Sequence, residues 1–259
     1  MKQFITLFLS TTFIWVFLFT TVCCQSLQAQ KTEVKQVYVL VHGTWGGGWA
    51  FKEVDSLMTF KNVIVYRPTL TGQGERAHLA SNTVGLDTHI MDIVNTVLFE
   101  DLHNIILVGH SYGGMVVAGV VNKIPERISK LVYLDAVVPE NGESLVTAMG
   151  ENTPQGLLVE DGFLIPKWVA KDAKAPKDVP HSLKTWTDKI VLDNPDRLKI
   201  PTTFILTVEK DKDPKKDGFA SQAERAKSKG WPVLMLESDH NAQWSAPKEL
   251  TEMLLELGK

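Results

Sequence analysis

The residues with the clearest capacity for chemistry lie in the segment Leu107-Val108-Gly109-His110-Ser111-Tyr112-Gly113-Gly114. An apolar run, 104–108, precedes the serine, and an apolar segment of helical character, 115–121, follows it. This is a G-x-S-x-G pattern in a strand–turn–helix setting. The backbone of a serine at so sharp a turn is strained, and glycines two residues away avoid a clash with a β-carbon. The pattern predicts a nucleophilic Ser111 beside the N-terminal amides of a helix, which favour negative charge.

A serine hydroxyl becomes a good nucleophile only when a base removes its proton and a third group orients that base. His240 follows the last predicted strand, 233–236, and Asp211 follows the strand before it, 202–208. The loops after parallel strands converge on one edge of a sheet. We therefore predict that Ser111, Asp211 and His240 meet there, in the chain order serine, acid, histidine.

Other carboxylates compete with Asp211 for the role of the acid. Asp213 lies two residues further along the chain, and Glu209 is expected to belong to the strand end. Asp135 follows the strand after Ser111, on an edge that also faces the site, although its simpler role is that of a hydrogen-bond acceptor in a loop. We favour Asp211 over these alternatives.

Acyl transfer also requires donors for the oxyanion of the tetrahedral intermediate. The backbone amide of Tyr112 is one predicted donor, and Thr44, in the loop after the first strand, is the other. His42 is expected to brace that loop through hydrogen bonds. The triple glycine at 46–48 lacks the Gly-Lys-Ser/Thr ending of a phosphate-binding loop, so a nucleotide is not expected.

The remaining histidines carry no predicted chemistry. His78, His89 and His103 are assigned to loops or helix surfaces, and no role is assigned to His181. No pair of histidines has the spacing of a metal site, so neither a metal nor another cofactor is predicted.

Alternating strands and helices must position these residues. Apolar strands are predicted at 34–41, 62–66, 104–108, 130–134, 202–208 and 233–236, separated by helices that include 86–99 and 247–257. Strands that are apolar throughout are typical of a parallel sheet covered on both faces. The proline-rich segment at about 140–199 interrupts this rhythm and has too many large apolar side chains for a linker, which predicts a small cap insertion over the sheet.

Composition and the N-terminus restrict the class of protein. With 259 residues, 44% hydrophobic residues and a net charge of -3, the chain suits one globular domain and shows no preference for nucleic acid. Residues 1–29 have a basic start, a long apolar centre and a small residue at Ala29, which predicts a signal peptide cleaved after Ala29 and export to the periplasm or medium. An uncleaved membrane anchor is the alternative. The two cysteines, Cys23 and Cys24, would leave with the signal.

Several motifs together resemble the α/β-hydrolase superfamily. They are Val41-His42-Gly43-Thr44-Trp45, Gly109-His110-Ser111-Tyr112-Gly113-Gly114 and Asp239-His240. The chain is most similar to the branch that holds plant methyl esterases, hydroxynitrile lyases and related bacterial carboxylesterases. The resemblance implies a mostly parallel sheet of about six strands flanked by helices, a domain at 30–259, and a triad at Ser111, His240 and Asp211.

Two departures from that branch narrow the expected chemistry. The lyases carry threonine after the first motif histidine and lysine after the catalytic one, where this chain has Gly43 and Asn241. The resemblance therefore implies a serine hydrolase that cleaves a small or medium carboxylic ester through an acyl-enzyme, without a cofactor. A ligand-binding protein of the same fold, or a lactonase or haloperoxidase-like enzyme with the same triad, is the alternative. The sequence indicates neither the ester nor the oligomeric state.

Overall fold

The computed structural model describes residues 35–150 and 157–259. The predicted signal peptide, 1–29, and its cleavage after Ala29 lie outside the described residues. Within the described ranges, no helix has the length and apolar character needed to cross a membrane.

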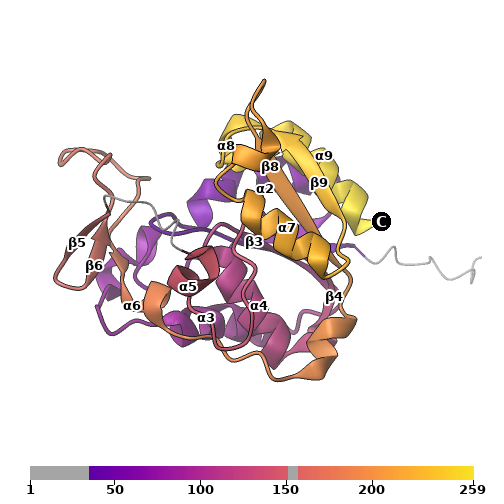
Figure 1. Ribbon diagram of the computed structural model, residues 1–259, viewed down its shortest axis with the longest axis horizontal. Coiled ribbons are helices and arrows are strands. Elements are labelled where there is room, and N and C mark those ends of the chain that lie inside the picture. Colours follow the sequence, from indigo (N-terminus) through magenta and orange to yellow (C-terminus); the bar gives the residue numbers. More distant parts are fainter. Residues whose placement is uncertain (1–34, 151–156) are drawn as a thin grey trace, which may run out of the picture. The chain divides into compact units, whose positions relative to one another are not determined.

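A six-stranded parallel sheet organises the fold (Figure 1), as predicted. Its strand order is β2-β1-β3-β4-β8-β9. The strands are β1 (Val37–Val41), β2 (Ile64–Tyr66), β3 (Ile105–His110), β4 (Ile128–Leu134), β8 (Thr202–Val208) and β9 (Val233–Glu237). β3 and β4 occupy the centre and are mostly buried, which explains why their sequences are mostly apolar.

Helices cover both faces of the sheet, and the alternation of side chains along each strand separates two apolar clusters. One face packs against α3, α4 and α7, and the other against α2 and α9. The helices are α2 (Lys52–Phe60), α3 (Leu86–Phe99), α4 (Gly113–Lys123), α5 (Leu145–Met149), α6 (Lys184–Thr187), α7 (Ala220–Ser228), α8 (Ala242–Ser245) and α9 (Pro247–Gly258). The 3-10 helices are η1 (Gly48–Phe51), η2 (Gly74–Leu79), η3 (Pro125–Arg127), η5 (Pro195–Lys199) and η6 (Pro214–Lys216).

The register of the central strands places the functional residues at one edge. His110 of β3 pairs with Leu134 of β4, and Leu134 pairs with Ile205 of β8. Ser111 and Asp135 therefore follow directly from adjacent strands at the same carboxyl edge. Val208 of β8 pairs with the last residue of β9, so the loop that carries His240 begins at this edge too.

The segment between β4 and β8, which we call the cap segment (140–199), adds no strand to the main sheet in its described part. It forms a separate antiparallel sheet of β5 (Leu158–Glu160), β6 (Phe163–Ile165) and β7 (His181–Ser182). Figure 1 shows this small sheet to one side of the main sheet, near α6. No strand was expected here, because these strands are only two or three residues long and their side chains do not alternate clearly.

Candidate active site

Ser111 occupies the strained turn that the glycine pattern predicted. Its φ is 56°, and it lies directly between β3 and α4. A β-carbon at Gly109 would come 2.7 Å from the carbonyl oxygen of Gly113, and one at Gly113 would come 2.7 Å from that of Val41. The Ser111 amide donates to the Leu134 carbonyl over 3.2 Å, which ties the turn to the end of β4.

His240 forms a hydrogen bond with a buried carboxylate that follows β4. The distance from His240 Nδ1 to Asp135 Oδ2 is 2.6 Å, and the amide of Thr207 donates to Asp135 Oδ1 over 3.2 Å. The Asp135 side chain is 1% exposed and that of His240 is 37% exposed. Because Nδ1 donates to the carboxylate, Nε2 is the nitrogen left free to accept a proton from a neighbouring hydroxyl.

Asp211 does not take the position that the sequence predicted for it. It is exposed in the loop after β8, and no hydrogen bond or ion pair joins its carboxylate to another described residue. The two neighbouring candidates are engaged locally, since Glu209 pairs with Lys212 and Asp213 accepts from the Lys215 amide. The loop turns outward after Val208, and this leaves the neighbouring strand end at Asp135 to contact His240.

Two rings flank the His240 imidazole. Phe219 is stacked on it, with ring centroids 4.8 Å apart and an interplanar angle of 8°. The His110 ring lies 4.7 Å away, and its Nε2 donates to the His240 carbonyl over 2.8 Å. His110 lies next to Ser111 in the sequence, and this hydrogen bond holds the loop that carries His240.

The loop after β1 approaches the serine closely. A β-carbon at Gly43 would come 2.9 Å from Ser111 Cβ, so only glycine fits there without a shift. The next residue is Thr44, and neither its amide nor that of Tyr112 donates to another residue in the part of the chain that the structure describes. Both amides therefore remain free to hold an oxyanion.

Side chains behind the loop after β1, which we call the oxyanion loop (42–47), fix its shape. The Leu70 amide donates to His42 Nε2 over 3.1 Å, so the proton of this neutral ring resides on Nδ1, which donates to the Gly43 carbonyl over 2.8 Å. This agrees with the predicted bracing role of His42. Trp186 Nε1 donates to Thr44 Oγ1 over 3.0 Å and joins the loop to the cap segment.

Tyr112 is held by His89, which was wrongly assigned to a surface. The His89 side chain is buried, its Nδ1 lies 2.9 Å from the Tyr112 hydroxyl, and its Nε2 lies 2.9 Å from the Thr71 carbonyl. Since that carbonyl can only accept, Nε2 carries the proton and Nδ1 accepts from the phenol. Burial raises the pKa of Tyr112 well above its usual value, which keeps this donor protonated.

His181, which had no predicted role, connects β7 to the oxyanion loop. The Trp45 amide donates to His181 Nδ1 over 3.4 Å, and His181 Nε2 lies 2.8 Å from the Thr185 hydroxyl oxygen. The Val179 amide in turn donates to the Trp45 carbonyl over 2.9 Å. Trp45 has a φ of 66°, so the cap segment supports a strained residue next to Thr44.

The buried histidines make stability depend on pH. Burial lowers the pKa of His42 to about 4, and it lowers the pKa of His89, His110 and His181 as well. The unfolded chain therefore binds more protons than the folded one between pH 6.5 and 4, and stability falls as the solution is acidified through that range. For His42 alone, acidification from pH 7.5 to 5 is expected to lower the free energy of unfolding by about 2 kcal/mol, measured by urea unfolding.

A matched pair of variants separates His42 from other titrating groups. His42→Gln is expected to reduce the slope of unfolding free energy against pH, by up to about 1.4 kcal/mol per pH unit near pH 5.5. His78 is exposed, and His78→Gln is the matched control for the substitution itself. An unchanged slope in His42→Gln would contradict the assignment.

Ser111, His240 and the oxyanion loop line one cavity of about 620 Å³. Its walls are largely apolar and aromatic, with Trp45, Trp168, Trp186, Phe219 and Trp244 among them. A cavity of this size and character suits a small organic substrate.

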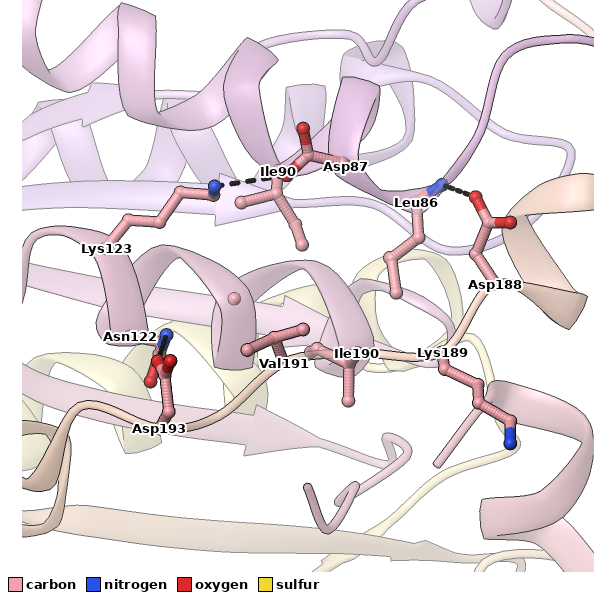
Figure 2. Close-up of a pocket in the computed structure, with 11 residues that line it drawn as sticks. Leu86, Asp87, Ile90, Asn122, Lys123, Asp188, Lys189, Ile190, Val191 and Asp193 are labelled. Carbon is pink, nitrogen blue, oxygen red and sulfur yellow. Dashed lines mark hydrogen bonds and ion pairs between the residues drawn. The ribbon is translucent and has the colours of Figure 1, made fainter. Parts of the chain in front are cut away.

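A second hollow, of about 520 Å³, lies between α3, α4 and residues 188–193 (Figure 2). Most of its polar side chains pair with one another or with backbone. Lys123 contacts Asp87 over 3.1 Å, and Asp188 accepts from the Leu86 amide over 3.1 Å. No serine, cysteine or histidine lines it, so it lacks the hydroxyl or thiol nucleophile and the imidazole base that acyl transfer by a triad requires. Across the described ranges, no cluster of three or more histidine, cysteine or acidic residues could hold a metal ion.

Comparisons with known proteins agree with this geometry. A family model described as "Alpha/beta hydrolase family" matches residues 38–253. The chain is 34% identical to a carbendazim hydrolyzing esterase of Nocardioides sp. (strain SG-4G), over 85% of this chain and 99% of that protein. It is 27% identical to a pheophorbidase of Raphanus sativus, over 84% and 92% of the two chains. The crystal structure of the methylesterase MES16 from Arabidopsis superimposes with a TM-score of 0.67 at 25% identity, over 86% of this chain and 98% of that one.

Proposed function

The chain belongs to the alpha/beta hydrolase family and is a carboxylic ester hydrolase, and from this premise we propose that Ser111, His240 and Asp135 form its catalytic triad. The observation that carries the proposal is the 2.6 Å hydrogen bond between His240 Nδ1 and Asp135 Oδ2, beside a cavity that Ser111 also lines. A buried carboxylate, an oriented imidazole and a strained serine are the parts that this chemistry needs.

In the first half of the reaction, Ser111 Oγ attacks the ester carbonyl while His240 Nε2 takes its proton. The Asp135 carboxylate holds the ring in the Nδ1–H tautomer and stabilises the imidazolium that forms. The amides of Thr44 and Tyr112 bind the oxyanion, and the N-terminus of α4 adds a favourable field. Collapse of the intermediate expels the alcohol, which takes its proton from His240, and leaves an acyl group on Ser111.

In the second half, water repeats the sequence. His240 accepts a proton from water as its oxygen attacks the acyl carbonyl, and the same two amides bind the second oxyanion. Breakage of the bond to Ser111 Oγ returns the proton to the serine and releases the carboxylic acid. Each step uses side chains and amides of this chain alone.

The substrate class that we propose is a methyl ester whose acyl group contains a ring. The aromatic walls of a cavity of about 620 Å³ support a ring-sized acyl group. The names of the relatives support the rest, since one is an esterase that hydrolyses carbendazim and another is a methylesterase.

The proposed function predicts that a fluorophosphonate probe labels Ser111, because such probes react with activated serine nucleophiles and mimic the tetrahedral intermediate. The purified full chain should carry one covalent adduct, which peptide mass spectrometry assigns to Ser111, and it should release methanol from methyl benzoate. Denatured protein is the control and should not react. If the folded protein does not react either, a ligand-binding protein of the same fold becomes the better interpretation.

A further inference from the structure

Three indole rings lie together in the cavity wall where the cap segment meets the loop after β1, those of Trp45, Trp168 and Trp186. Trp45 and Trp168 meet edge to face with centroids 4.8 Å apart, and Trp45 and Trp186 lie 6.0 Å apart. Each indole N–H is already used within the protein. Trp45 donates to the Leu164 carbonyl, Trp168 to Asp178 and Trp186 to Thr44, over 2.9, 2.8 and 3.0 Å. A ligand therefore meets their rings and not their N–H groups.

Among the described residues that line the cavity, the fixed charge is negative. Asp178 is the one carboxylate among the described residues that line it, and no lysine or arginine is among them. Burial lowers the pKa of the lining residues His42 and His110, so both rings are neutral near pH 7. The base, His240, is already paired with Asp135. Nothing in this lining offers a fixed positive charge to an anionic group of a substrate.

Asp178 is held in place but lacks a countercharge. Trp168 Nε1 donates to Asp178 Oδ2, which leaves Oδ1 open, and Asp178 forms no ion pair within the described part of the chain. Burial raises the pKa of Asp178, which means that the ionised carboxylate is under-solvated where it lies. A carboxylate in this condition gains most from a ligand that brings an N–H donor or a positive charge.

Resting on the proposed esterase function, we propose that this cavity selects esters that carry a protonated or N–H-bearing nitrogen, and that Asp178 is the residue that recognises this nitrogen. The electron-rich faces of the surrounding indoles attract a cationic nitrogen in the same place. Anionic esters are disfavoured, because they would face Asp178 without a compensating cation. Trp168 acts as a positioning residue, since its N–H fixes one carboxylate oxygen and aims the other.

Three methyl esters of matched shape test the proposal on the full chain at pH 7. They are methyl 4-(aminomethyl)benzoate, methyl 4-methylbenzoate and the methyl monoester of terephthalic acid, which are cationic, neutral and anionic. We expect kcat/KM to fall in that order, with about a tenfold preference for the cation over the neutral ester, the size of one charge-assisted hydrogen bond. Because the nitrogen is remote from the reacting carbonyl, the preference should appear mainly in KM.

Two variants identify the residues responsible. Asp178→Asn keeps the shape and can still accept from Trp168, so it should abolish the preference, measured within the variant as the ratio of kcat/KM for the cationic ester to that for the neutral ester. Trp168→Phe keeps a ring but removes the donor, and it should reduce the preference without abolishing it. Equal kcat/KM for the cationic and neutral esters, or a preference that survives in Asp178→Asn, would overturn the proposal.

A binding measurement separates this proposal from the proposed function. Quenching of tryptophan fluorescence gives the Kd of each ester for the Ser111→Ala protein, with and without Asp178→Asn, independently of turnover. An Asp178-dependent preference in Kd with no turnover by the unchanged protein would contradict the esterase triad and support the recognition site. Turnover without any charge preference in Kd or KM would contradict the recognition site alone.

Discussion

Ser111→Ala is expected to lower kcat for methyl benzoate by about four to six orders of magnitude, because removal of a triad nucleophile costs this much in serine hydrolases. The reason lies in the order of events, since without Oγ no acyl-enzyme forms and only direct attack by water remains. Substrate binding should change little, because alanine leaves the cavity walls intact. Initial rates over a range of ester concentrations, at high enzyme concentration, measure both quantities.

The backbone of Ser111 makes this variant a clean test. Alanine can keep both the φ of 56° and the hydrogen bond that the backbone amide of residue 111 donates to the Leu134 carbonyl. The far-ultraviolet circular dichroism and the thermal midpoint should therefore match those of the unchanged protein. The variant should also fail to react with the fluorophosphonate probe. Turnover within tenfold of the unchanged protein would remove Ser111 from the mechanism.

Local patterns explain why the serine turn and its surroundings could be predicted. The position of Ser111 depends on Gly109 and Gly113, which lie two residues away and meet backbone oxygens at 2.7 Å. Thr44 follows the first strand, and neighbouring strands of a parallel sheet end at the same edge. Interactions of this kind depend on residues that are close together in the sequence, so a short motif is enough to predict them.

The carboxylate that pairs with His240 could not be predicted in the same way, because its choice depends on how two loops fold after neighbouring strands. Asp135 directly follows β4 and Asp211 follows β8, and these strands are adjacent in the sheet. Both carboxylates begin at the correct edge. Only the tertiary structure shows that Asp135 is buried against Thr207 and His240, whereas Asp211 is exposed in a loop that turns outward.

The burial of His89 follows from the helical periodicity of α3. In α3, the buried apolar positions include Leu86, Ile90 and Ile93, and a helical spacing puts residue 89 on the same face. A polar residue on a buried face requires partners, and the structure supplies Tyr112 and Thr71. The helical periodicity predicts the burial, but the identity of the partners depends on segments far away in the chain.

Asp135→Asn is the second variant with a large expected effect, and it distinguishes the two candidate acids. The asparagine amide can donate to the imidazole and so favours the wrong tautomer, with the proton on Nε2, which cannot then act as a base. The equivalent change in a serine protease triad lowers kcat about 10⁴-fold. We expect a loss of about 10³- to 10⁴-fold in kcat for Asp135→Asn, against a change of less than about twofold for Asp211→Asn, because Asp211 is exposed and its carboxylate forms no hydrogen bond or ion pair with a described residue.

Combining the substitutions tests whether Asp135 acts through Ser111 and His240. Members of a triad act as a unit, so Ser111→Ala with Asp135→Asn should be no slower than Ser111→Ala alone. Asp135 also accepts from the Thr207 amide, and the thermal midpoint of Asp135→Asn therefore has to be measured beside its activity. A folded Asp135→Asn protein with near-normal kcat, together with an inactive Asp211→Asn protein, would return the role of the acid to Asp211. The opposite pattern assigns the orientation of His240 to the buried carboxylate at the end of β4.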